Sequence, residues 1–301
     1  MTQLKIYGLI GYPVKHSYSA FMHNAAFKAF GINAEYRLFE IKPEELDKLF
    51  LTENSPVDIN GNLVQKADLC GLNVTIPHKE AVLKYLSWRS SETKFTEAAN
   101  VVIFKNKNYI EGWNTDGLGF HKHLAKDLKL SFLDKKAAIL GAGGAAKAVV
   151  DQLAKKGVKS IIIYDLDKAR SARITDKIKK EYPSVESYAV DSVDGLNIAG
   201  AELLINCTPV GMKVEDPCLV SPEMLHRGLF VYDLIYNPQE TKLLKLAKEK
   251  GAQGSNGLGM LLYQGVRTFE IFEAEFIKEN EISINDIVEV MRSALMEAVG
   301  R

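Results

Sequence analysis

Several features that define whole classes of protein are scarce in this sequence. Its 301 residues include only three cysteines, Cys70, Cys207 and Cys218, with no C-x-x-C spacing, which argues against a disulfide framework and a structural zinc site. Neither charge is in excess, because 38 Lys and Arg residues balance 38 Asp and Glu residues, so nucleic acid is not an expected partner. No stretch approaches the roughly 20 apolar residues of a membrane-spanning helix, so we expect no membrane partner.

The rest of the composition is that of an ordinary globular protein. Hydrophobic residues make up 47% of the chain and charged residues 25%, and the length suits about two domains. The chain starts with the polar Met1-Thr2-Gln3 instead of the apolar run of a signal peptide, so we expect a cytoplasmic location. His121 and His123 look like a metal-binding pair, but residues two apart on a helix point to different faces, and we expect no metal.

Residues 1–115 alternate between strand-like and helix-like segments. The expected strands are 5–10, 36–41 and 72–76, and the expected helices are 20–30 and 43–50. Strands separated by helices predict a mainly parallel sheet with crossover connections. Segments 101–104 and 109–113, joined by residues 105–108, predict a hairpin that adds an antiparallel edge.

A second α/β domain is predicted over residues 116–256. Its expected strands are 137–140, 161–165, 187–190, 203–207 and 230–234, with helices at 145–155, 169–181 and 239–250. After a turn at 254–257, two helical stretches, 260–278 and 284–299, complete the chain without another strand. By pattern alone these two helices could pack on either domain.

A glycine-rich turn follows the first strand of the second domain. Gly141-Ala142-Gly143-Gly144-Ala145-Ala146 fits the dinucleotide-binding pattern G-x-G-x-x-A between a strand and a helix, where backbone N–H groups approach a pyrophosphate. Asp165 ends the next strand, where a carboxylate accepts from a ribose hydroxyl and repels a 2′-phosphate, so we expect a Rossmann domain that prefers NAD. NADP is the alternative, in which Asp167 caps the next helix and Lys168 or Arg170 covers the phosphate.

Polar residues gather near one strand end of the first domain. Asn73 and Thr75 are two apart and share a face, Pro77 ends the strand, and Lys79 follows. Ligands bind at such strand ends in open α/β sheets. Asp116 lies at an expected helix start, where a structural cap is the simpler interpretation, and Lys79 by itself fits a solvated surface lysine.

Six sequence blocks, taken in order, resemble the shikimate dehydrogenase family (shikimate/quinate 5-dehydrogenases). They are Gly11-Tyr12-Pro13-Val14-Lys15-His16-Ser17-Tyr18-Ser19, Asn73-Val74-Thr75-Ile76-Pro77-His78-Lys79, Asn114-Thr115-Asp116-Gly117, the turn at Gly141, Asn206-Cys207-Thr208-Pro209-Val210-Gly211-Met212, and Gly257-Leu258-Gly259-Met260 with Gln264. The blocks occur in the family's order and are spread over nearly the whole chain. The resemblance implies an N-terminal substrate domain completed by residues 257–301, so the C-terminal helices return to the first domain.

The resemblance also implies an activity and a set of site residues. The expected reaction is the reversible nicotinamide-dependent reduction of 3-dehydroshikimate to shikimate, in chorismate and aromatic amino acid biosynthesis. Lys79 and Asp116 are the implied catalytic pair. The implied substrate contacts are Ser17, Ser19, Asn73, Thr75, Asn100, Tyr236 and Gln264. The implied cofactor contacts are Gly141, Ala142, Gly143, Gly144, Ala145, Asp165, Thr208, Gly257 and Met260.

The residue types suit this chemistry. Reduction of a ketone develops negative charge on oxygen, which an ammonium such as Lys79 stabilises and protonates, while Asp116 orients it. The sequence Asp165-Leu166-Asp167 is similar to relatives that use NAD and also accept quinate, whereas Ser19 is the form associated with shikimate. The alternatives are therefore a quinate dehydrogenase and a catalytically silent dinucleotide-binding regulator, and a homodimer is left open.

Overall fold

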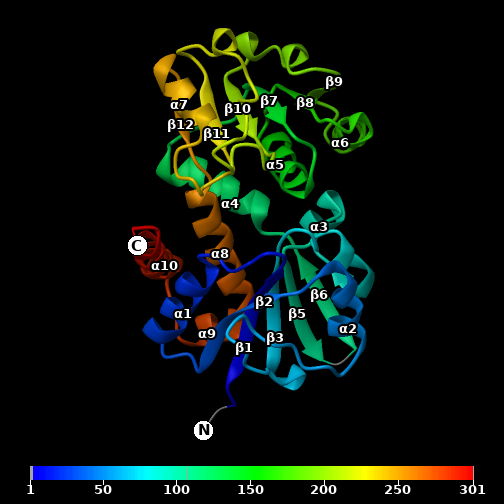
Figure 1. Ribbon diagram of the computed structural model, residues 1–301, viewed down its shortest axis with the longest axis vertical. Helices are drawn as coiled ribbons and strands as arrows, with labels where there is room; N and C mark the ends of the chain where they lie inside the picture. The colour runs from blue at the N-terminus through cyan, green and yellow to red at the C-terminus, as the bar shows by residue number, and fades with distance from the viewer. Residues whose placement is uncertain (1–2, 107, 301) are drawn as a thin grey trace. The chain divides into compact units, whose positions relative to one another are not determined.

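The computed structural model describes residues 3–106 and 108–300. Met1, Thr2, the centre of the expected 105–108 turn at Lys107, and Arg301 lie outside the described residues. The chain divides into two compact units, one of residues 1–119 with 262–301 and the other of residues 120–261. Each unit contains its own sheet and its own core (Figure 1).

Unit 1 is built on a six-stranded mixed sheet in the order β2-β1-β3-β5-β6-β4. Its strands are β1 (Lys5–Gly11), β2 (Ala34–Glu40), β3 (Leu69–Val74), β4 (Trp88–Arg89), β5 (Val101–Asn106) and β6 (Tyr109–Trp113). The first three strands are parallel, and β5 and β6 form the predicted antiparallel hairpin. The mainly parallel sheet and the hairpin are therefore confirmed, but the hairpin does not form the edge of the sheet, because β4 lies beyond β6 and pairs with it in parallel.

Helices from both ends of the chain pack in unit 1. They are α1 (Ser19–Ala29), α2 (Leu46–Leu51), α3 (Ser91–Thr96), α9 (Ala274–Glu279) and α10 (Ile284–Val299), with most of α8 (Leu258–Phe272). Helix α1 packs on α10, and Phe27 of α1 lies 5.4 Å from Phe269 of α8 between ring centroids. Burial of these aromatic rings favours the return of the C-terminal helices to the first unit, as the resemblance implied.

Unit 2 is a doubly wound fold with an all-parallel sheet in the order β12-β11-β10-β7-β8-β9. Its strands are β7 (Lys136–Leu140), β8 (Ser160–Tyr164), β9 (Glu186–Val190), β10 (Leu203–Asn206), β11 (Phe230–Asp233) and β12 (Gln253–Ser255). Its helices include α5 (Gly144–Lys155), α6 (Lys168–Glu181) and α7 (Lys242–Glu249). The Rossmann prediction is confirmed, and β12 is an extra strand where the sequence predicted only a turn.

The segment that follows the first sheet also differs from expectation. Helix α4 (Asp116–Lys122) begins at the predicted residue and continues into one turn of π-helix at His123–Asp127. A π turn inserts one residue into the helical repeat, which no hydrophobic period in the sequence signals. Among the described residues, no helix is long and apolar enough to cross a membrane.

Candidate active site

Lys79 and Asp116 form a direct ion pair in unit 1. Lys79 lies beyond the end of β3, and Asp116 is the first residue of α4. The Lys79 Nζ is 2.6 Å from Asp116 Oδ2, and their side chains are 19% and 7% exposed. The ammonium is thus fixed in direction by a buried carboxylate while part of it stays accessible, which is the arrangement that a proton donor to a bound ligand requires.

Asn100 connects this pair to the rest of the polar cluster. Its Nδ2 donates to Asp116 Oδ1 over 2.8 Å and to Thr115 Oγ1 over 2.9 Å, and it lies 3.5 Å from Gln264 Oε1. Its Oδ1 accepts from the backbone N–H of Thr115 over 2.8 Å. Asn100 therefore bonds to Oδ1 of Asp116, while Lys79 bonds to Oδ2.

Asn73 lies at the buried end of β3 and is held from three sides. Its Nδ2 donates to the Asn100 carbonyl and to Thr268 Oγ1, both over 3.2 Å. Its Oδ1 accepts from the Tyr36 hydroxyl over 2.7 Å. These partners fix which end of the amide is the donor and leave one lone pair of the Asn73 oxygen available to a ligand hydroxyl.

Two of the predicted substrate residues, Ser17 and Thr75, lie on the loops that follow β1 and β3, and Ser19 is the first residue of α1. Thr75 follows the last residue of β3, and a Cβ on Gly11 would overlap its methyl group, so only glycine permits this approach. The Ser17 hydroxyl donates to Ser19 Oγ over 3.2 Å. Ser19 is buried at the start of α1, and Ser17 and Thr75 are half-buried.

The structure thus brings most of the implied substrate residues together in unit 1. It supplies three partners that the sequence did not single out: Tyr36, Thr115 and Thr268. Thr115 was visible as part of the block that contains Asp116. Tyr36 and Thr268 carried no signal, because a tyrosine in an alternating strand and a threonine in an apolar helix both resemble ordinary core residues.

The glycine-rich turn of unit 2 has the backbone that dinucleotide binding requires. Gly141 has φ of +97°, and a Cβ there would lie 2.9 Å from Thr208 Cγ2. Gly143 is the N-cap of α5 with no side-chain cap, and a Cβ there would meet nothing within 4 Å. The N–H groups at Gly144 and Ala145 therefore begin a helix whose end has open space for a phosphate.

The carboxylate of Asp165 is part of that turn. Its Oδ2 accepts from the Ala142 N–H over 2.7 Å, and its Oδ1 accepts from the Asp167 N–H over 2.8 Å. Asp167 in turn caps α6 by accepting from the Ala169 N–H over 3.0 Å. Both oxygens of Asp165 thus accept hydrogen bonds from backbone N–H groups. The sequence pattern does not distinguish this structural role from ribose binding.

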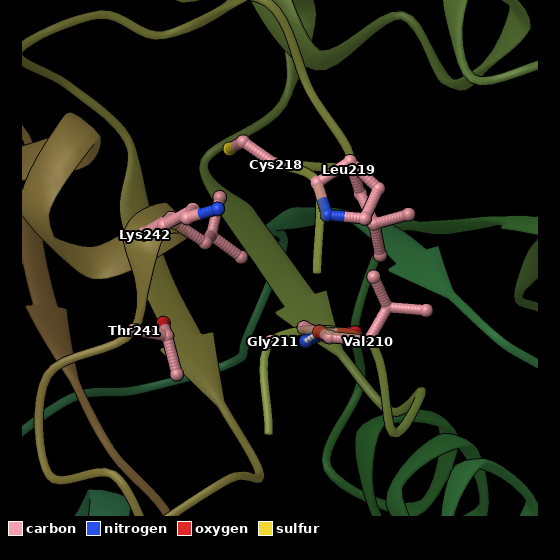
Figure 2. A pocket seen from close by; sticks show the side chains of 9 residues that line it. Val210, Gly211, Cys218, Leu219, Thr241 and Lys242 are labelled. Atoms are coloured by element: carbon pink, nitrogen blue, oxygen red, sulfur yellow. Dashed lines mark hydrogen bonds between the residues drawn. The ribbon is translucent and has the colours of Figure 1, made fainter. Parts of the chain in front are cut away.

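Thr208 is held by the side-chain amide of Asn206, which the Asp233 carboxylate holds in turn. Asn206 Oδ1 accepts from the Thr208 hydroxyl over 2.7 Å, and Asn206 Nδ2 donates to Asp233 Oδ1 over 3.0 Å. Asp233 also accepts from Thr241 over 2.7 Å, and burial raises the pKa of its carboxyl. Figure 2 shows the small hollow beside this network, lined in part by Gly211 and Thr241. Its polar lining is already paired, so it offers little to a ligand.

The turn before α8 is packed as tightly as the glycine-rich turn. A Cβ on Gly257 would overlap the Leu234 carbonyl oxygen, and a Cβ on Gly259 would overlap the His123 ring. His123 Nδ1 lies 2.8 Å from the Tyr232 hydroxyl. Met260 is buried in the core of unit 2, and Tyr236, in the loop after β11, is half-buried. Within the residues that are described, no group of histidine, cysteine, aspartate or glutamate has the arrangement of a metal site.

Comparison with known proteins identifies the family to which this architecture belongs. Residues 9–102 match the family model described as the shikimate dehydrogenase substrate binding domain, and residues 123–211 match that of shikimate/quinate 5-dehydrogenase. The NADP(+) shikimate dehydrogenase of Methanopyrus kandleri is 39% identical over 98% of this chain and 96% of its own length.

The chain belongs to the shikimate dehydrogenase family. A crystal structure of a shikimate dehydrogenase with NADP+ superimposes with a TM-score of 0.82 at 34% identity, covering 99% of this chain and 98% of that one. The Listeria monocytogenes shikimate 5-dehydrogenase, solved with shikimate and NAD, superimposes with a TM-score of 0.78 at 33% identity, covering 94% and 99%. The two-domain fold expected from the resemblance is confirmed for this member of the shikimate dehydrogenase family.

The expectation of NAD as the preferred cofactor is wrong. Four shikimate dehydrogenases that are 36–40% identical to this chain carry NADP(+) in their names, and a similar structure contains NADP+. The prediction assumed that Asp165 presents a free carboxylate to the ribose. Each of its oxygens accepts one backbone N–H group, so the carboxylate has a structural role in the turn that accounts for an aspartate at this position without NAD.

Proposed function

We propose that this chain is an oxidoreductase that interconverts 3-dehydroshikimate and shikimate with NADP as its cofactor, a step toward chorismate and the aromatic amino acids. The observation that carries the proposal is the ion pair of Lys79 with Asp116, inside a polar cluster of a shikimate dehydrogenase fold. A catalytically silent regulator would have no need to keep this pair intact. The intact pair therefore favours an enzyme.

Lys79 is the proposed proton donor. As the substrate carbonyl is reduced, negative charge grows on its oxygen, and an ammonium within hydrogen-bond distance stabilises that charge and delivers a proton. Asp116 lies 2.6 Å from the Lys79 Nζ and orients it, and Asn100 keeps Asp116 in place. In the reverse direction the same lysine receives the proton of the substrate hydroxyl.

The remaining polar residues of unit 1 form the proposed substrate site. The Ser17 and Ser19 hydroxyls hold the substrate carboxylate, and Asn73, Thr75 and Asn100 contact or support its ring hydroxyls. Gln264 and the Tyr236 side chain complete the proposed set. We propose two domains with these roles. Residues 1–115 with 257–301 bind the substrate, and residues 116–256 bind the dinucleotide.

The turn of unit 2 fits an NADP dinucleotide. Gly141 and Gly143 keep side chains out of the turn, and the start of α5 offers backbone N–H groups to the pyrophosphate. Thr208, Gly257 and Met260 are proposed to line the nicotinamide. When bound, the dinucleotide supplies the electron pair for the reduction.

Two cations directly after β8 are proposed to recognise the 2′-phosphate. Lys168 and Arg170 lie on the first turn of α6, with side chains 67% and 55% exposed. They pair with Asp191 over 2.8 Å and with Asp167 over 3.4 Å. Exposed pairs of this kind are weak and exchange readily for a doubly charged phosphate.

A rate assay on the purified protein tests the proposal. Nicotinamide absorbance is followed with shikimate or quinate as substrate, each paired with NADP+ or NAD+. We expect the highest kcat/KM for shikimate with NADP+. Absence of turnover in all four combinations, from folded protein that still binds dinucleotide, would contradict it, and faster turnover of quinate would support a quinate dehydrogenase. A cytoplasmic location and a homodimer stay predictions.

A further inference from the structure

Tyr36 of β2 places a hydroxyl against Asn73 of the proposed substrate site. The tyrosine is 3% exposed, and its hydroxyl donates to Asn73 Oδ1 over 2.7 Å. Burial raises the pKa of the Tyr36 hydroxyl well above its usual range, so it stays protonated.

The Tyr36 ring and backbone are held by adjacent residues of α1. The ring of His23 stacks on it with centroids 4.4 Å apart and an angle of 3° between planes. The Asn24 side chain accepts from the Tyr36 N–H over 2.8 Å and donates to the Tyr36 carbonyl over 2.9 Å. Neither ring nitrogen of His23 has a hydrogen-bond partner among the described residues, so this ring acts as a flat packing surface. Such a position leaves the hydroxyl little freedom.

We propose that the Tyr36 hydroxyl is a positioning group for substrate, which fixes the orientation of the Asn73 amide. The inference rests on the proposed function. With Asn73 Oδ1 facing Tyr36 and its Nδ2 donating to Thr268 and the Asn100 carbonyl, the amide has one defined orientation. Its remaining oxygen lone pair then faces a ring hydroxyl without a prior rearrangement.

Because Tyr36 acts on a group that holds an unreacting part of the substrate, its loss should weaken binding and spare the chemical step. An interaction that is equally strong in the bound substrate and in the transition state appears in KM and not in kcat. The net contribution of a typical hydrogen bond corresponds to about a three- to tenfold change in an equilibrium constant.

Tyr36→Phe tests the inference, because it removes only the hydroxyl. We expect the KM for shikimate to rise about three- to tenfold, with kcat within about twofold of wild type and the KM for NADP+ unchanged. Tyr7→Phe is the matched control. Tyr7 is also 3% exposed, and its hydroxyl lies 2.9 Å from Glu273 Oε1 and 3.2 Å from the Phe272 carbonyl oxygen. We expect Tyr7→Phe to lose similar stability with no change in the KM for shikimate.

A double-mutant cycle with Asn73→Ala separates positioning from general destabilisation. If Tyr36 acts through Asn73, the KM increases of Tyr36→Phe and Asn73→Ala combine to less than their product. Fully multiplicative effects, an unchanged KM in Tyr36→Phe, or an equal rise in Tyr7→Phe would overturn the inference while wild type stays active. An inactive wild type would instead contradict the proposed function, and the inference with it.

Discussion

The two units hold their functional groups in opposite ways. In unit 1, side chains from β2, β3, α4 and α8 bond to one another, as in the chain of contacts from Tyr36 through Asn73 to Thr268. In unit 2, Gly141 and Gly257 make room for backbone, and the Asp165 carboxylate accepts backbone N–H groups. The site in unit 1 should therefore respond to changes of functional group, and the site in unit 2 to changes of backbone conformation.

The largest expected effect is on the ion pair of unit 1. We expect Lys79→Ala and Asp116→Ala each to lower kcat for shikimate oxidation by about two orders of magnitude or more with the fold intact, since each removes part of the proton-transfer pair. Steady-state kinetics measures kcat, and circular dichroism shows whether the fold is intact. Lys84→Ala is the control, because Lys84 and Asp47 form an ion pair of 2.7 Å with side chains 60% and 61% exposed. Near-normal turnover in both site variants would contradict the assignment.

The matching test in unit 2 changes backbone freedom. At Gly141, with φ of +97° and no room for a Cβ, alanine should cost about 2 to 3 kcal/mol of strain and clash. We expect Gly141→Ala to weaken NADP+ binding by at least about thirtyfold in calorimetric titration.

Gly61 provides the control, because alanine there also strains the backbone but lies outside the proposed dinucleotide site. It has φ of +86°, and a Cβ there would meet nothing within 4 Å. Gly61→Ala should therefore leave NADP+ affinity unchanged. Wild-type affinity in Gly141→Ala would show that the turn of unit 2 does not depend on its backbone conformation.

Acid should destabilise unit 1 through His23. Burial lowers the pKa of its imidazole to about 3, so between about pH 6.5 and pH 3 the unfolded chain binds a proton that the folded chain does not. Stability is therefore lost as the pH falls through this window, by about 2 kcal/mol at pH 5. His23→Phe keeps a ring against Tyr36 and should remove this loss in urea denaturation at pH 7 and pH 5. His16→Gln, at an exposed histidine, should keep the wild-type loss.

The smallest expected effect concerns nucleotide choice in unit 2. We expect the double variant Lys168→Ala with Arg170→Ala to raise the KM for NADP+ about five- to tenfold and leave the KM for NAD+ unchanged, because only NADP carries the 2′-phosphate. Lys179→Ala with Lys180→Ala, at the end of the same helix, is the control for helix charge. Equal changes for both cofactors would show that these cations do not recognise the phosphate.

Local pattern was sufficient for most of the fold. The hydrophobic periods predicted the parallel strands of both units and the hairpin of β5 and β6, since each depends on neighbours in sequence. The short β12 and the π turn at His123–Asp127 were missed, because tertiary packing produces them against weak or absent local preference.

The candidate site divides in the same way. The Gly141 turn and the pairing of Lys79 with Asp116 were predicted from motif spacing and family resemblance. The part played by Tyr36 was not, because Tyr36 and Asn73 lie on different strands, far apart in sequence, and meet only in the folded sheet. The interpretation of Asp165 was wrong for a related reason, since the sequence shows a carboxylate at a strand end and not what it accepts from.

The sequence by itself determined the α/β fold class, the glycine-rich turn and the residue types of the active site. These features depend on residues that are close in sequence. The spacing of apolar side chains predicts helices and strands, and glycine permits the backbone conformation of the turn. Only the tertiary structure decided which polar atoms pair, as in Asn100 with Asp116 and Tyr36 with Asn73. A buried polar group must find a partner, and that partner is chosen by the packing of distant segments.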